Sequence, residues 1–134
     1  MVFPVTPEDV RDEIWKASDG IATGRGDLRA RQLLRVLKQV PHERIVEGVL
    51  QVFSSVNRIS NRFPDQEIAG LILEEINPVA SGCPVELLKR CLATWNQSIE
   101  QLPFWLLHQY GQEVISGALQ KIAAEKLAAE ENKN

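Results

Sequence analysis

The chain has 134 residues, of which 44% are hydrophobic and 25% are charged, and its formal net charge is -3. This length and composition predict a single globular domain over residues 1–134 and exclude wholesale disorder. The acidic balance argues against general affinity for nucleic acid. No stretch approaches the roughly 20 consecutive apolar residues that a membrane span needs.

The N-terminal stretch and the cysteines bear on localisation. The first residues include neither a basic leader nor an apolar run, which predicts a cytoplasmic protein without a targeting segment. Cys83 and Cys91 are the only cysteines. On one helix they would lie about 12 Å apart along the axis, too far for a disulfide. We therefore expect two free, mostly inaccessible thiols, and no zinc site, because the spacing of metal ligands is missing.

Prolines and glycines divide the chain into predicted helices. The first helix is predicted over residues 6–18, with Thr6 as N-cap, Pro7 at the first helical position and Asp9 near the capping-box position. Three glycines at 20, 24 and 26 end this helix, and residue 26 or 27 caps the next one. The second helix has an apolar face that consists of Ala30, Leu33, Leu34, Leu37 and Val40.

A third helix is predicted over residues 41–60, opened by Pro41. Apolar residues cover about half of its circumference, which indicates packing on several sides and places it at the centre of the core. These residues are Ile45, Val46, Val49, Leu50, Val52, Phe53, Val56 and Ile59.

Three further helices complete the prediction, over residues 61–78, 83–102 and 103–131, and residues 128–134 are expected to fray. No segment alternates as a strand would, so a sheet is not expected. The fifth helix has a narrow apolar stripe that consists of Leu88, Cys91, Leu92, Trp95, Ile99 and Leu102.

The predicted fold is therefore an all-α, compact bundle of five to six helices around the third. A short HEAT-like α-solenoid is the alternative, because two segments share a Gln-(Val/Leu)-Pro pattern followed by apolar positions. These segments are KQVPHERIVEGVLQVF, residues 38–53, and EQLPFWLLHQYGQEVI, residues 100–115.

The glycine-rich stretch before the second helix resembles a phosphate-binding loop only superficially. Gly20 and Gly24 are followed by Arg25 without the Lys-Ser/Thr pair of a Walker loop, and the preceding strand of a dinucleotide fingerprint is also missing. A helix N-terminus remains, with Arg25 and Arg29 within reach of an anion. Binding of an anionic ligand or nucleic acid through residues 24–38 is therefore kept as an alternative function.

The second helix also carries a basic ridge, which consists of Arg31, Arg35 and Lys38 at i, i+4 and i+7. We interpret it first as a solvated face, or one paired with acidic side chains of this chain such as Glu74 and Glu75. Docking of an acidic protein is the second interpretation, and nucleic acid is the least favoured. The candidate docking residues are Arg25, Arg29, Arg31, Arg35 and Lys38.

Side chains for catalysis are sparse. His108 is predicted on the apolar face of the last helix, where a lone histidine is more often a hydrogen-bonded core residue than a base. No serine or cysteine has a histidine at a plausible helical spacing, and no carboxylate pair shares a helix face. We therefore predict that the chain is not an enzyme and has no cofactor or metal.

The segment LPFWLLHQYG is the strongest functional lead. Its apolar residues surround the helix, with Phe104 and Leu107 on the predicted core stripe, Trp105 on one flank, and Leu106 and Tyr110 on the other. A terminal helix can hardly be buried on all sides within so small a domain, and Tyr and Trp often anchor interfaces. We therefore predict a non-enzymatic interaction module that forms a homodimer through Trp105, Leu106 and Tyr110, with burial in the core as the alternative.

Overall fold

The computed structural model describes residues 2–132 except 22, 23 and 25. Within these residues the chain forms seven α-helices, one 3₁₀ helix and no strand, which confirms the all-α class. The helices outnumber the predicted five to six because the last predicted helix is divided into two. Their bounds are α1 (Pro7–Ile21), α2 (Gly26–Leu37), α3 (His42–Phe53), η1 (Ile59–Asn61), α4 (Arg62–Ile76), α5 (Pro84–Cys91), α6 (Gln101–Tyr110) and α7 (Gln112–Glu131).

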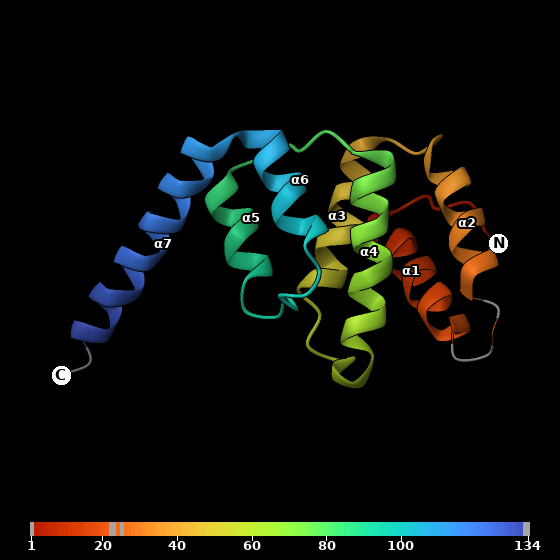
Figure 1. Ribbon diagram of the computed structural model, residues 1–134, viewed down its shortest axis with the longest axis horizontal. Helices are drawn as coiled ribbons and strands as arrows, with labels where there is room; N and C mark the ends of the chain where they lie inside the picture. Colours follow the sequence, from red (N-terminus) through yellow and green to blue (C-terminus); the bar gives the residue numbers. More distant parts are fainter. Residues whose placement is uncertain (1, 22–23, 25, 133–134) are drawn as a thin grey trace.

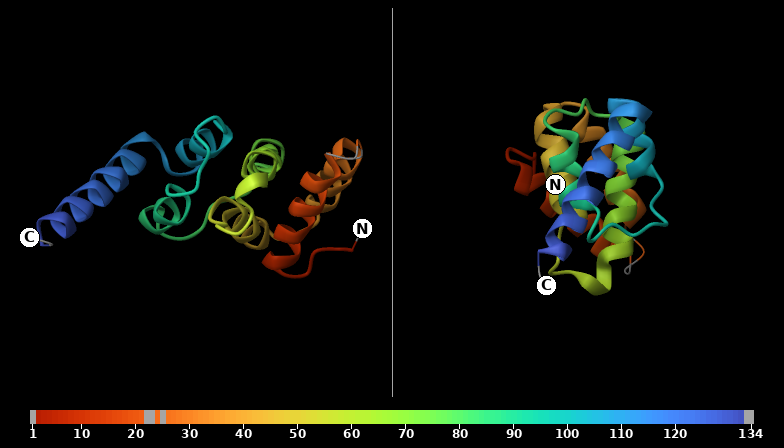
Figure 2. Two further views of the ribbon diagram at one scale, coloured as in Figure 1. Left: turned by 90° about the horizontal axis from the view of Figure 1, so that it is seen from below. Right: turned by 90° about the vertical axis from the view of Figure 1, so that its left-hand side faces the viewer.

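The helices alternate between two layers (Figures 1 and 2). In one layer α1, α3, α5 and α7 each pack against the next, and in the other α2, α4 and α6 do the same. The layers meet face to face, so that α4 lies on α1 and α3 of the other layer and beside α2 of its own. The last helix leaves the stack obliquely, and its C-terminal half projects from the body of the molecule (Figure 1).

The start of α1 has the predicted capping box. Thr6 Oγ1 accepts a hydrogen bond from Asp9 N, and Asp9 Oδ2 accepts one from Thr6 N, each at 3.1 Å. Hydrogen bonds from the backbone of Val5 and Thr6 lower the pKa of Asp9. The helix continues to Ile21, three residues beyond the predicted end, since one glycine weakens a helix by only about 1 kcal/mol.

The third helix is central, as predicted, and packs against α1, α4 and α5. Gly48 lets α1 approach closely, because a Cβ at this position would lie 2.6 Å from Val10 Cβ and 2.8 Å from Pro7 O. The helix ends at Phe53 rather than at residue 60. Ser54 Oγ donates to Leu50 O at 2.8 Å, and the run SSVN that follows Phe53 consists of weak helix formers. Two residues predicted in the apolar face, Val56 and Ile59, are consequently exposed.

The fifth helix ends at Cys91, not at residue 102, because a side chain from α4 holds the following turn. Buried Gln66 donates from Nε2 to Thr94 O and accepts from Asn96 N at Oε1, both at 2.7 Å. Thr94 Oγ1 donates to Phe53 O. The turn therefore has its polar backbone groups paired by residues distant in the sequence.

The break between α6 and α7 lies at Gly111, which has φ 85° and ψ 158°, a conformation that favours glycine. Pro103 lies in the first turn of α6, whereas Pro41 precedes α3. The helices within the two segments that suggested a repeat, α3 and α6, lie in different layers. Residues 128–131, predicted to fray, belong to α7, and residues 133–134 lie outside the described residues.

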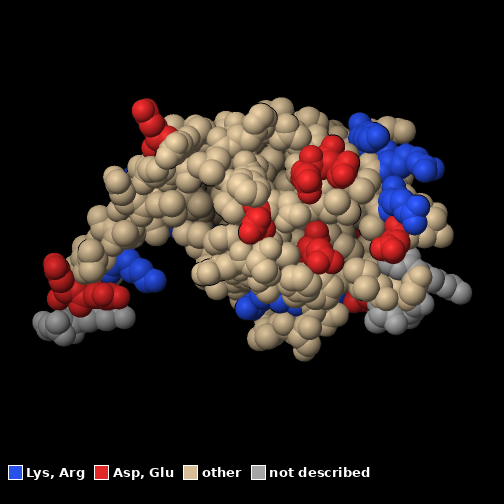
Figure 3. Space-filling view, viewed as in Figure 1, with Lys and Arg blue, Asp and Glu red and all other residues tan. Residues whose placement is uncertain are grey.

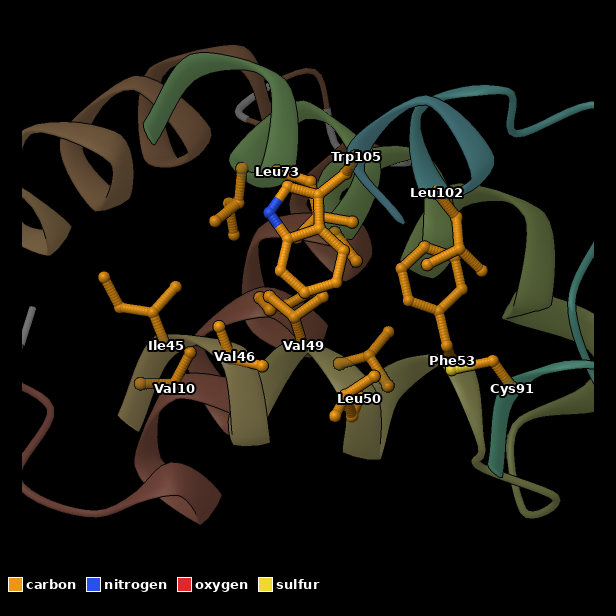
Figure 4. Close-up of a cluster of buried hydrophobic side chains, with 14 of the residues drawn as sticks. Val10, Ile45, Val46, Val49, Leu50, Phe53, Leu73, Cys91, Leu102 and Trp105 are labelled. Carbon is orange, nitrogen blue, oxygen red and sulfur yellow. The ribbon is translucent and has the colours of Figure 1, made fainter. Parts of the chain in front are cut away.

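One core cluster extends through the stack. Figure 4 shows Trp105 of α6 pointing toward Leu73 of α4 and Val49 of α3, while Phe53 lies near Leu102. In the part of the chain that the structure describes, no helix combines the length and apolar character needed to cross a bilayer.

Candidate functional site: an apolar groove at the C-terminal end

The sixth helix turns its predicted interface residues inward. Leu102, Trp105 and Leu106 follow the i, i+3, i+4 spacing of one helix face, and all three are buried. Trp105 Nε1 donates to Pro78 O at 2.9 Å, so its polar atom is satisfied within the chain. Trp105 and Leu106 are therefore buried in the core, as the alternative prediction stated. Tyr110 is half-buried, and its hydroxyl donates to Gly82 O at 3.1 Å.

The exposed face of α6 carries the residues that were predicted in the core. Phe104 is 64% exposed and Leu107 is 39% exposed. The prediction was wrong because it assumed one continuous helix, in which Phe104 and Leu107 would lie on the same buried face as Ile115. The change of direction at Gly111 removes this relation between the two helices.

An uncharged groove of about 570 Å³ lies between α5, α6 and α7. It is lined by Leu88 and Cys91 of α5, by Leu106 and Leu107 of α6, and by Ile115 and Leu119 of α7, among others. The described residues that line it include no Asp, Glu, Lys or Arg. Figure 3 shows this uncharged surface as a tan hollow between the projecting helix and the body.

The wall of the groove that α7 forms has few buried side chains. Only Ile115 and Ala118 of α7 are buried. Lys89 Nζ lies 2.8 Å from Glu125 Oε2, but both side chains are more than 40% exposed, and such pairs contribute little. Leu119 is 42% exposed and Leu127 is 61% exposed. The sequence prediction did not include these leucines, although their spacing with Ala123 at i, i+4 and i+8 marks a helix stripe.

The two cysteines are free thiols in different environments. Cys91 is buried at the base of the groove, and burial raises the pKa of its thiol to about 12. Cys83 lies at the N-cap of α5 and is exposed, contrary to the expectation that both thiols would be inaccessible. Only Cys83 is therefore available to a reagent in the folded protein.

The basic ridge lies on the outer side of α2, at the other end of the stack (Figure 3). Arg31, Arg35 and Lys38 are exposed, and in the described part of the chain none of them forms an ion pair. The suggested pairing with Glu74 and Glu75 is therefore not observed. Arg29 instead lies 3.3 Å from buried Glu13 of α1, and Arg25 lies outside the described residues.

His108 is exposed, which corrects its predicted place in the core. It borders a second cleft of about 520 Å³ together with Glu74, Glu100 and Phe104. Within the described residues, no three His, Cys, Asp or Glu side chains are grouped so that they could hold a metal ion.

Comparison with protein-family models, with curated proteins and with solved structures gives no match to this chain. The geometry of the two ends of the stack is therefore the basis on which a function is assigned.

Proposed function

We propose that this chain is a non-enzymatic, cytoplasmic protein–protein interaction module that forms a homodimer through α7 and the groove beside it. The observation that carries the proposal is the uncharged groove bordered by exposed leucines at positions 107 and 119. An uncharged groove bordered by exposed leucines offers the kind of surface that the apolar core of a protein–protein contact covers. The two-layer packing supports an interpretation of the fold as a short HEAT-like solenoid, a class that binds partners through its surfaces.

The test is the association state of the purified chain. We expect the wild type to sediment as a dimer and the Leu119→Glu variant to sediment as a monomer with unchanged helicity by circular dichroism. A charge placed in an apolar contact costs several kcal/mol, whereas Leu119 is exposed enough in one copy to accept it. Leu106 is unsuitable for this test, because it is buried within the chain.

A matched control carries the same substitution at the other end. Leu28 of α2 is 60% exposed, and Leu28→Glu should leave the dimer intact. A wild type that remains monomeric at high concentration would refute the proposal.

The alternative function is binding of an anionic ligand, nucleic acid or an acidic protein through residues 24–38. Its support is the exposed basic ridge on α2, whose side chains are available to a partner. We rank it second because Arg29 is engaged with Glu13 and because an outward charged face also keeps an end helix soluble.

A further inference from the structure

The groove side of α7 carries a stripe of uncharged side chains. The stripe consists of Gln112, Ser116, Leu119, Ala123 and Leu127, which lie within one narrow sector at about 100° per residue. Gln112, Ser116 and Leu119 line the groove, and the stripe continues beyond it through two exposed residues. About its midpoint, just after Leu119, Gln112 mirrors Leu127 and Ser116 mirrors Ala123.

From this stripe we infer that the occupant of the groove is α7 of a second copy, packed antiparallel about a two-fold axis near Leu119. The inference rests on the proposed function and specifies its geometry. Two identical helices related by a two-fold axis across their contact run antiparallel, so Gln112 faces Leu127 of the other copy and the two Leu119 side chains meet beside the axis. Small Ser116 then faces small Ala123 of the partner, which lets the helices approach. Exposed Leu127 enters the partner's groove beside Gln112 and Leu107.

The layering of the fold points to the same orientation. α4 packs against α1, α2 and α3 and runs antiparallel to α3, its neighbour in the chain (Figure 1). A helix in the groove would touch α5, α6 and α7, and one antiparallel to α7 would repeat the relation of α4 to α3. The partner's α7 would therefore continue the layer of α2, α4 and α6.

Charge also favours the antiparallel arrangement. The five residues of the stripe and the residues that line the groove are uncharged. At about 100° per residue, Lys121 and Glu125 lie on the other side of α7, and Lys126 lies at the edge of the stripe. Antiparallel packing brings the acidic last turn of one copy, Glu130 and Glu131, to the N-terminal end of the other α7, whose free N–H groups carry partial positive charge. Because the contact is reciprocal, it closes at two copies and leaves no free groove to propagate a filament.

Disulfide trapping tests the geometry in the full chain with exposed Cys83 changed to Ser, while buried Cys91 is retained. Under mild oxidation, Leu119→Cys should link to itself. Gln112→Cys and Leu127→Cys should link only when the two variants are mixed, because like positions would lie about 22 Å apart along the axis. Lys121→Cys, on the opposite side of α7, is the control that should not link.

The outcomes separate this inference from the proposed function. Self-linking of Gln112→Cys or of Leu127→Cys in a chain that sediments as a dimer would overturn the antiparallel geometry and leave the dimer standing. Species larger than a dimer that grow with concentration would overturn the reciprocal contact. A wild type that is monomeric would overturn both. Each variant is also sedimented in the reduced state, so that loss of linking is attributed to geometry only where the dimer persists.

Discussion

The two ends of the helix stack are closed in different ways. At the N-terminal end α2 turns charged residues outward, and buried Glu13 ties it to α1 through Arg29. At the C-terminal end α6 and α7 turn Phe104, Leu107 and Leu119 outward. In layered helical proteins a polar outer face ends the stack, whereas an apolar one calls for another helix. The difference teaches that this chain closes its helix stack with a charged face at one end and leaves an apolar groove uncovered at the other.

Ionic contacts also distinguish the two ends. Arg58 bonds buried Asp65 through Nε at 2.8 Å and Nη2 at 2.9 Å, and Asp19 through Nη2 at 2.7 Å. These carboxylates raise the pKa of Arg58 above its usual value, and its guanidinium lies 5.3 Å from the ring centroid of Trp15. This cluster joins α1 to the start of α4. Among the described residues, the ion pair that joins α5 to α7, Lys89 with Glu125, is mostly exposed.

The largest effect is expected from a substitution that weakens the packing of α6 on α3 and α4. Trp105→Ala should lower the free energy of unfolding by about 3–5 kcal/mol, because it empties a buried site between α3, α4 and α6 and leaves Pro78 O without its donor. Phe104→Ala, the neighbouring exposed aromatic, should change it by less than about 0.5 kcal/mol. Urea unfolding followed by circular dichroism measures both. Equal losses in the two variants would contradict the observed faces of α6.

Two glycines, one in α3 and one in α7, allow the packing around these helices to be compared by adding one methyl group at each. Gly48→Ala should destabilise by about 1–3 kcal/mol, because the added methyl group meets Val10 and the carbonyl oxygen of Pro7. Gly117→Ala in α7 should stabilise by about 0.5–1 kcal/mol, since nothing lies within 4 Å and alanine is the better helix former. Thermal unfolding of both variants gives the signs. Two changes of the same sign would mean that the contact between α1 and α3 and the surroundings of α7 are packed alike.

The smallest expected effect concerns the basic ridge. Changing Arg31, Arg35 and Lys38 together to Gln should alter the free energy of unfolding by less than about 1 kcal/mol, because all three side chains are exposed. We expect duplex DNA to bind the wild type no more tightly than about micromolar at physiological salt. Nanomolar binding that weakens steeply with salt and disappears in the triple variant would instead establish the alternative function.

Local signals predicted much of the fold. Thr6, Asp9 and the prolines identify helix starts because capping depends on residues within one turn. The width of its apolar face identified α3 as central, because a helix that packs on several sides needs apolar residues around much of its circumference. The ends of α3 and α5 were not predictable in this way. Gln66 decides where the turn after α5 runs, and its partners lie 28 and 30 positions away in the sequence.

The sequence pointed to the segment that borders the groove, but Trp105 and Leu106, two of the predicted interface residues, are buried in the core. The segment from Phe104 to Tyr110 was recognised as too apolar for one domain to bury on all sides. Which side would be buried depended on the helix break at Gly111, and a glycine inside a helical pattern can be tolerated or can end the helix. The register of α6 relative to α3 and α4 then follows from packing of Trp105, which no local pattern determines.

The packing of each helix on its near neighbours bears on how the chain folds as it is made. α4 packs against α1, α2 and α3, all of which precede it in synthesis. The helices α1 to α4 can therefore contact one another while α5, α6 and α7 are still being translated. Leu107 and Leu119, which border the groove, are made after these four helices, which shortens the time during which the two leucines are exposed without a neighbouring helix.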